Sequence, residues 1–297
     1  MEIIKDMFPA NVPGMKLNNG AVMPQVGLGV FHLEEGDDCY NSVLTALKDG
    51  YRHIDTAYAY ANERSVGRAV KDSGIPREQI WITSKLWPNE YGPEETPAAL
   101  ERMRKRLGVD YIDMVYLHQP VGDYVGAYKV MEQELKAGHL RALGISDFDY
   151  SDELYHSLVD NVELVPDCFQ MECHPYAQRK HWQELLKLTG SVLEAWFPLG
   201  GRESNNAVLG DAILKEIADK HNKTVAQIIL RWHVQEGHAV VPGSHNPVHI
   251  KEDIDIFDFE LSDEEMKRIG DIDKEERVFT ETLSTIQKWF TDYKLYD

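Results

Sequence analysis

The chain has 297 residues, a length that allows one large domain or two ordinary ones. Apolar residues make up 43% and charged residues 27%, a balance typical of globular proteins rather than of disordered or fibrous chains. The 31 basic and 50 acidic residues give a net charge of −19. This charge argues against a nucleic-acid partner, because nucleic-acid phosphates bind clustered Lys and Arg. A small anion could still bind at a local positive site.

The sequence predicts a soluble cytoplasmic protein. No apolar run approaches the ~20 residues that span a bilayer, so we expect no membrane partner. The segment Met1–Asp6 lacks the basic region and apolar core of an export signal. The cysteines, Cys39, Cys168 and Cys173, are few and odd in number, as expected in a reducing compartment. The strong negative charge favours a monomer or a weak homodimer.

The first predicted element is a β-hairpin. Asn19-Gly20 separates the segments 15–17 and 21–23, and Asn-Gly accepts the positive φ of tight hairpin turns. Eight later segments, several of them rich in β-branched and aromatic residues, are predicted to be strands. They cover residues 26–30, 52–55, 80–83, 111–117, 140–145, 168–171, 191–195 and 238–241.

Helices are predicted to follow these strands. Pro97 lies in the first turn of one helix, and Thr224 and Ser262 each begin a capping box. The predicted helices cover residues 39–48, 65–71, 128–137, 152–159 and 181–188, with others that begin at 96, 224 and 262.

Eight strand–helix units in one chain predict a parallel sheet closed into a (β/α)8 TIM barrel. We expect one barrel domain over residues 1–297, with the hairpin as an N-terminal cap and an extra C-terminal helix or loop. A doubly wound sheet has the same periodicity, but it would usually carry a glycine fingerprint after its first strand. Gly27-Leu28-Gly29 is only a partial match, and close backbone packing also explains it. No P-loop motif is present.

Four polar side chains follow the predicted strand ends, where a barrel carries its active site. Asp55, Lys85 and His118 end the second, third and fourth strands, and Tyr60 stands five residues after Asp55. Each has an ordinary alternative. Asp55 could cap a helix, Lys85 could be a solvated loop residue, and His118 could be a hydrogen-bonded strand-end residue.

Together these four side chains suit the protonation of an alkoxide as it forms on a carbonyl carbon. A phenol with a pKa near 10 is a weak acid at neutral pH, but an ammonium ~4 Å away stabilises the phenolate by roughly 1–4 kcal/mol. Burial of Tyr60 opposes this effect. Asp55 can hold Lys85 charged, and His118 can hydrogen-bond the substrate oxygen. Such chemistry implies a hydride donor.

Six sequence blocks follow the hairpin in a fixed order. The first is GYRHIDTAYAYANE at 50–63, and the others lie at 83–87, 117–120, 144–148, 170–175 and 195–200. In this order they resemble the aldo-keto reductase family, most closely the prokaryote-type branch that includes 2,5-diketogluconate reductases. The resemblance extends to about residue 269. It implies that Tyr60 is the general acid, that Lys85 and Asp55 tune it, and that His118 orients the carbonyl.

The resemblance also implies a nicotinamide cofactor, NAD(P)H, extended across the barrel mouth without a Rossmann domain. Ser146 and Gln170 would bond the carboxamide, and Trp196 would stack on the ring unless it is a core residue. Asp147 stands where Asn is frequent in the family. A carboxylate can accept from the carboxamide amine but cannot donate to its oxygen.

Further departures concern the phosphates of the cofactor. Phe197 stands where Ser or Ala is frequent, which removes a pyrophosphate donor, and Leu199 lies in the same predicted cofactor segment. Gly243 and His249 stand where the family has the Lys and Arg that usually hold the 2′-phosphate. Each lost charge-assisted bond is worth roughly 1.5–3 kcal/mol. We therefore expect NADH to be used unusually well.

The rest of the adenosine segment keeps some binding capacity. Ser244, His245 and His249 could still bind a 2′-phosphate, most strongly when the histidines are protonated. Asp253 and the adjacent Glu252 could accept from the adenine amine, or could be solvated helix carboxylates.

Two other chemistries are not expected. Cys168, Cys173 and His174 invite a zinc site, but the Cys-x4-Cys spacing has no second pair and Pro175 follows His174, so no metal is predicted. No G-x-S-x-G motif is present, which argues against a serine hydrolase.

By resemblance, Phe31, Tyr58, Trp87 and His118 would surround the substrate carbonyl, which suits small to medium aldehydes, ketones and keto-sugars. The aromatic tail, residues 277–297, would either close over the mouth as a substrate loop or form a helix on the barrel exterior. A different class also stays open, namely a non-catalytic cofactor-binding barrel that acts as a redox-sensing or interaction subunit. The presence of all four polar residues favours the reductase.

Overall fold

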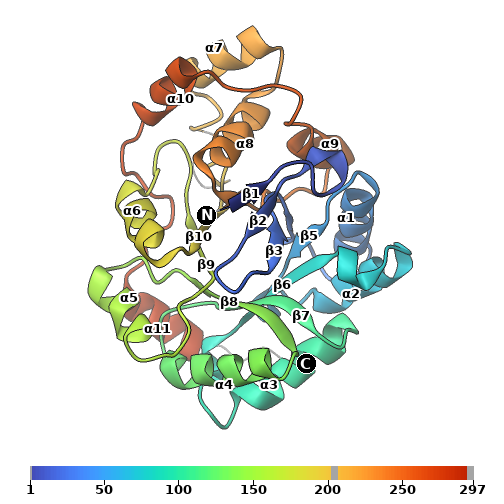
Figure 1. Ribbon diagram of the computed structural model, residues 1–297, viewed down its shortest axis with the longest axis vertical. Coiled ribbons are helices and arrows are strands. Elements are labelled where there is room, and N and C mark those ends of the chain that lie inside the picture. Colours follow the sequence, from blue (N-terminus) through green and yellow to red (C-terminus); the bar gives the residue numbers. More distant parts are fainter. Residues whose placement is uncertain (1, 202–206, 293–297) are drawn as a thin grey trace.

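The computed structural model describes residues 2–201 and 207–292 and forms a parallel barrel ringed by helices (Figure 1). Neighbouring strands pair in parallel in sequence order, and a bridge between Val26 and Val240 joins the two ends of the sheet. The predicted (β/α)8 barrel is therefore confirmed, and the doubly wound alternative is wrong. The strands are β4 (Leu28–Gly29), β5 (His53–Asp55), β6 (Trp81–Leu86), β7 (Ile112–Leu117), β8 (Leu140–Ser146), β9 (Cys168–Glu172), β10 (Val192–Trp196) and β11 (Ala239–Val240).

Helices cover the outside of the barrel. Both predicted capping boxes form, at Thr224 and at Ser262. The sequence reading did not predict α7, which Asp211 caps by accepting from two backbone N–H groups. The helices are α1 (Asp37–Lys48), α2 (Glu63–Asp72), α3 (Thr96–Leu107), α4 (Tyr124–Lys136), α5 (Asp152–Val159), α6 (Lys180–Thr189), α7 (Ala212–His221), α8 (Val225–Glu236), α9 (Pro247–Ile254), α10 (Asp263–Gly270) and α11 (Leu283–Asp292).

The N-terminal hairpin closes one end of the barrel. Strands β2 (Gly14–Lys16) and β3 (Val22–Pro24) pair antiparallel across the predicted turn, where Gly20 has a φ of +86°. A third strand, β1 (Glu2–Ile4), pairs with β2 and was not predicted. The buried side chains of Met15 and Met23 pack with residues from the barrel interior. Since the hairpin covers this end, an active site is expected at the other end, the mouth formed by the carboxyl ends of the strands.

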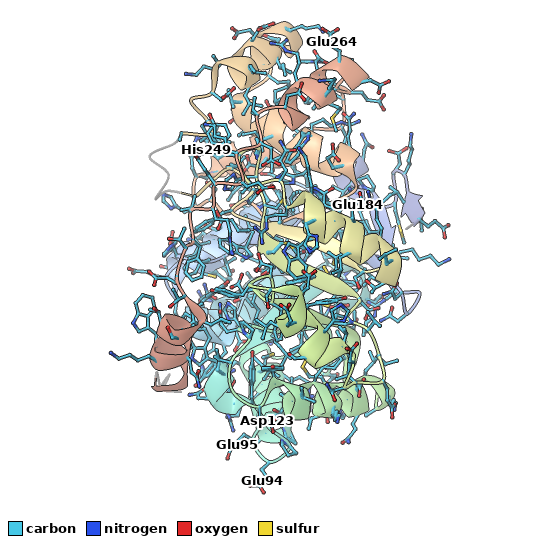
Figure 2. All side chains as sticks on the ribbon, turned by 90° about the vertical axis from the view of Figure 1, so that its left-hand side faces the viewer. Glu94, Glu95, Asp123, Glu184, His249 and Glu264 are labelled. Atoms are coloured by element: carbon cyan, nitrogen blue, oxygen red, sulfur yellow. The ribbon has the colours of Figure 1, made fainter. Side chains whose placement is uncertain are left out.

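The C-terminal tail crosses the other end of the barrel. In Figure 2 the hairpin and α11 lie on opposite sides of the molecule. The buried carboxylate of Glu172 anchors the tail, accepting from the backbone N–H of Val278 at 2.5 Å and of Phe279 at 3.0 Å. Farther along, the Phe290 ring meets Trp87 edge-on with centroids 4.6 Å apart. The tail thus forms a helix, and this helix touches a residue of the mouth. Residues 293–297 lie outside the described part.

Two predictions about the environment of the chain can be compared with the structure. Among the described residues, no helix is both long and apolar enough to cross a bilayer. Cys39, Cys168 and Cys173 are buried free thiols.

Candidate active site

Three of the four predicted catalytic side chains meet at the mouth. Asp55 ends β5, Lys85 lies near the end of β6, and Tyr60 ends the short 3-10 helix Tyr58–Tyr60 that follows β5. Lys85 Nζ donates to Asp55 Oδ1 at 2.6 Å and to the Thr56 carbonyl at 3.0 Å, and it lies 3.3 Å from Tyr60 Oη. Since β5 and β6 are adjacent parallel strands, their carboxyl ends bring these groups together.

Burial and charge set the protonation of this group. Burial lowers the pKa of Lys85, but Asp55 and then Tyr60 outweigh it and raise the pKa above its ordinary value. Burial raises the pKa of Tyr60 to about 12, although Lys85 opposes the shift. Burial therefore changes the pKa of Tyr60 more than the charge of Lys85 does. At neutral pH Lys85 is an ammonium and Tyr60 is a protonated phenol next to it.

His118 completes the predicted set. It follows β7, its backbone N–H donates to the Leu86 carbonyl at 3.1 Å, and its ring lies edge-on to Tyr60 with centroids 5.7 Å apart. Burial, helped by Lys85, lowers the pKa of His118 well below its ordinary value. The imidazole is therefore neutral and can donate one N–H. Its Nδ1 has no hydrogen-bond partner among the described residues.

Two further predicted pocket residues border these rings. Trp87 meets His118 edge-on at 5.2 Å, and Phe31, which is 46% exposed, lies 4.9 Å from Tyr60. Tyr58 is buried, and the guanidinium of Arg106 lies over its ring at 4.5 Å. The place of Tyr58 in a substrate pocket stays a prediction.

The residues predicted to hold the nicotinamide lie on or directly after three successive strands. Ser146 ends β8 and is paired in register with Gln170 of β9, and Trp196 ends β10. Gln170 Nε2 donates to Asp55 Oδ2 at 3.0 Å and to Glu194 Oε2 at 2.6 Å. Because both bonds use the side-chain NH2 group of Gln170, its side-chain carbonyl oxygen can accept a hydrogen bond from a ligand. A hydroxyl beside an amide carbonyl fits a carboxamide, which has one acceptor and one donor group.

Glu194 is a part of this site that the sequence reading missed. Its carboxylate has no exposed surface and accepts from Tyr116 Oη at 2.9 Å as well as from Gln170. Its indirect role is to orient the Gln170 amide. The available signal was an acidic residue inside the apolar segment 191–195, since Glu is rarely buried without partners.

The predicted pyrophosphate segment follows β10. Phe197 has a φ of +48°, and its ring lies 4.9 Å from Trp196 and 6.5 Å from Phe31. Leu199 is partly buried against the core. Residues 202–206, which continue this segment, lie outside the described part.

The predicted adenosine residues lie on the β11–α9 loop and on α9. A Cβ atom at Gly243 would lie 2.9 Å from the Gly29 carbonyl oxygen, so close backbone approach favours glycine there. Ser244 Oγ accepts from the Asn246 backbone N–H at 3.1 Å. His245 and His249 are exposed. A glycine therefore stands where the family resemblance expects the lysine, and an exposed imidazole on α9 stands where it expects the arginine.

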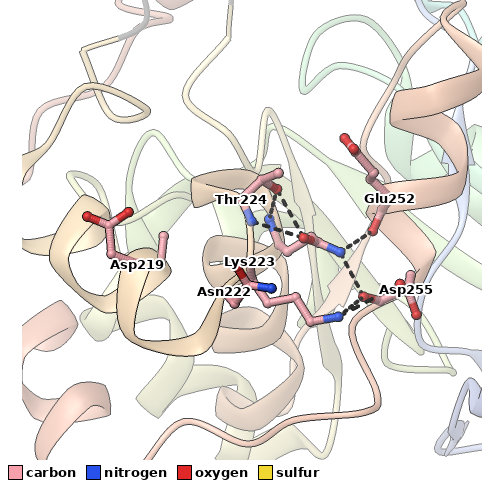
Figure 3. Close-up of a pocket in the computed structure, with 8 residues that line it drawn as sticks. Asp219, Asn222, Lys223, Thr224, Glu252 and Asp255 are labelled. Carbon is pink, nitrogen blue, oxygen red and sulfur yellow. Dashed lines mark hydrogen bonds and ion pairs between the residues drawn. The ribbon is translucent and has the colours of Figure 1, made fainter.

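The two carboxylates predicted for adenine differ in environment. Asp253 is buried, and burial followed by the charge of Glu252 raises its pKa to about 7. Glu252 is partly exposed and lines an open pocket of about 430 Å³ between α7, α8 and α9 (Figure 3). The backbone carbonyl oxygen of Glu252 accepts from Gln227 Nε2, which also donates to the backbone carbonyl of Asp255.

The structure separates the cysteines that suggested zinc. Cys168 packs in the barrel interior, and His174 bonds to Glu172. Cys173 instead lies near His233 and His238, with candidate ligand atoms within 4.8 Å of one another. The two histidine Nδ1 atoms are 3.1 Å apart, as in a hydrogen bond between neutral imidazoles. The absence of a metal stays a prediction.

Comparisons with known proteins agree with this geometry. Residues 25–274 match the model of the aldo/keto reductase family. The chain is 43% identical to glyoxal reductase of Bacillus subtilis over 267 residues, which cover 89% of this chain and 94% of that protein. It is 40% identical to 9,11-endoperoxide prostaglandin H2 reductase of Trypanosoma cruzi over 265 residues, 88% and 92% of the two chains.

Solved structures give the same result. A deep-sea metagenome aldo-keto reductase superposes with a TM-score of 0.86 at 37% identity, covering 95% of this chain and 100% of that one. An aldo-keto reductase of Bombyx mori in complex with NADP has a TM-score of 0.84 at 30% identity, covering 94% and 97%. The chain therefore belongs to the aldo-keto reductase family and is an NAD(P)H-dependent oxidoreductase.

Proposed function

We propose that this chain reduces the carbonyl group of small to medium aldehydes, ketones or keto-sugars, with Tyr60 as the general acid. The observation that carries the proposal is the buried contact of Lys85 with Tyr60 Oη at 3.3 Å and with Asp55 at 2.6 Å. The named relatives include a glyoxal reductase, which supports the carbonyl class. A cytoplasmic location fits the free cysteines.

Each residue has a defined task in this proposal. The cofactor, when bound, supplies a hydride. Tyr60 Oη gives its proton to the carbonyl oxygen, and Lys85 stabilises the phenolate that remains. Asp55 keeps Lys85 charged and fixed in place. Neutral His118 donates an N–H to the same oxygen and so orients the carbonyl, while Phe31, Tyr58 and Trp87 border the substrate.

Ser146, Asp147, Gln170 and Trp196 would hold the nicotinamide. At the distal end, Gly243 and His249 give no permanent cation for a 2′-phosphate, and this supports efficient use of NADH. His245 and His249 offer ring nitrogens to this phosphate but not the permanent charge of an arginine.

Replacing Tyr60 with Phe tests the catalytic role. Tyr60→Phe should lower kcat for aldehyde reduction about 10³-fold, because the proton donor is lost, while cofactor affinity changes little. Steady-state rates and fluorescence titration with NADH and NADPH measure the two effects. Tyr40→Phe, which alters a surface tyrosine, is the control. Retained turnover in Tyr60→Phe would contradict the assignment, and a parent protein that binds cofactor but turns over no carbonyl would favour the non-catalytic barrel.

Restoring a cation at position 249 tests the cofactor preference. His249→Arg should raise kcat/KM for NADPH about tenfold or more and leave the NADH value almost unchanged, since an arginine–phosphate bond is charge-assisted. Val248→Arg places the same charge on the exposed neighbouring residue and should have a smaller effect. A strong preference of the parent for NADPH at pH 7–8 would refute the proposal.

The tail is proposed to act as a substrate loop, because Phe290 contacts Trp87. Phe290→Ala should raise KM for aromatic aldehydes about two- to tenfold with little change in kcat, the range expected for one lost ring pair. Trp289→Ala removes a half-exposed ring from the same helix and serves as the control. An identical substrate profile for parent and Phe290→Ala would mean that α11 only packs on the barrel.

A further inference from the structure

Asp147 is held at the mouth by donors on both of its oxygens. It follows β8 in the left-handed region, with a φ of +61°, which Asn and Asp tolerate better than most residues. Oδ1 accepts from Trp196 Nε1 at 2.9 Å, and Oδ2 accepts from Gln119 Nε2 at 2.6 Å. An indole N–H can only donate, so this arrangement suits a carboxylate.

The charge of Asp147 is not cancelled by a partner of its own. Among the described residues no ion pair joins it to a cation. The nearby cation, Arg277, is paired with Asp149 and Glu172. Burial raises the pKa of Asp147 to about 7, Asp149 adds to the shift, and Arg277 opposes it. The uncharged phenols of Tyr60, Tyr91 and Tyr150 also face this carboxyl group.

Two more buried carboxylates, Asp55 and Glu194, belong to the proposed nicotinamide site. Gln170 bridges Asp55 and Glu194 through its amine, and Lys85 is paired with Asp55. Apart from Arg277, which is paired with two carboxylates of its own, the charged groups described here for the proposed nicotinamide site are three acidic side chains and one ammonium. His118, which borders the site, is neutral at physiological pH because burial lowers its pKa. A surplus of negative charge in a buried site acts strongly on any charge placed there.

We propose that Asp147 makes this chain select the oxidised form of its nicotinamide cofactor over the reduced form. The proposal rests on the proposed cofactor site. The oxidised ring carries a positive charge that the reduced ring lacks, so a carboxylate beside it favours the oxidised form alone. An asparagine at this position would keep the hydrogen bonds but supply no charge.

The geometry provides a variant that should fold. Asp147→Asn can still accept from Trp196, and its new amide N–H can donate to Gln119 Oε1 after that amide rotates. Gln119 Oε1 is buried and has no hydrogen-bond partner in the part of the chain that the structure describes. The substitution thus removes the charge and keeps one hydrogen bond to Trp196 and one to Gln119.

Equilibrium titration of NAD⁺ and NADH at pH 6.0 and 8.5 tests the proposal by affinity rather than by turnover. In the parent, the ratio of the Kd for NAD⁺ to the Kd for NADH should fall about tenfold as pH rises, because Asp147 ionises through about pH 7 and attracts the charged ring. In Asp147→Asn the ratio should not change with pH, and at pH 8.5 it should be about tenfold higher than in the parent.

Asp110→Asn is the matched control, since it removes an exposed carboxylate ahead of β7, at the end of the barrel opposite the mouth. It should behave as the parent does. Equal ratios in parent and Asp147→Asn at both pH values would overturn the proposal. A ratio that does not change with pH in the parent would also overturn it, and this result can be obtained from the parent alone. An equal loss of affinity for both cofactor forms in Asp147→Asn would also overturn it. If the parent binds neither form, the proposed function itself fails.

Discussion

The buried contact between Lys85, Asp55 and Tyr60 is the interaction on which the site depends. An ammonium with no exposed surface is stable only beside an opposite charge, and Asp55 supplies that charge at 2.6 Å. The same ammonium then lies within hydrogen-bond distance of the Tyr60 phenol. Because burial keeps this phenol protonated at neutral pH, Tyr60 carries the proton that the proposed general acid would give to a developing alkoxide. The barrel therefore places a protonated phenol beside the cation that would stabilise its conjugate base.

Closure of the barrel makes this contact possible. Asp55 and Lys85 are 30 residues apart, and Gln170 lies 115 residues beyond Asp55, yet both Lys85 and Gln170 bond to Asp55 because their strands belong to one closed barrel. The polar network continues from Gln170 to Glu194 inside the barrel. The hairpin closes the far end with apolar side chains, and the tail, anchored on Glu172, crosses the near end. Apolar side chains thus fill one end of the barrel, and the candidate active site lies at the other end.

Much of this arrangement could be predicted from the sequence. The turn at Asn19-Gly20, the eight strands and the capping boxes at Thr224 and Ser262 follow from local rules. The family motifs selected Asp55, Tyr60 and Lys85, which the structure brings into contact through Lys85. Local rules could not predict β1, because its pairing with β2 is a long-range contact. The roles of Glu172 and Glu194 depend on distant partners, which no spacing pattern reveals. The position of α11 follows from contacts such as Phe290 with Trp87, which only the folded chain brings together.

The most direct test of the account removes both charges of the central pair. The double variant Asp55→Asn/Lys85→Met leaves neither partner buried and unpaired, so folding should be preserved better than in either single variant. Single-turnover reduction of a small aldehyde by the enzyme preloaded with NADH measures the chemical step without the cofactor-binding step. The rate should be at least about 10²-fold below that of the parent, with the Kd for NADH changed less than about threefold. A rate close to that of the parent would contradict the account.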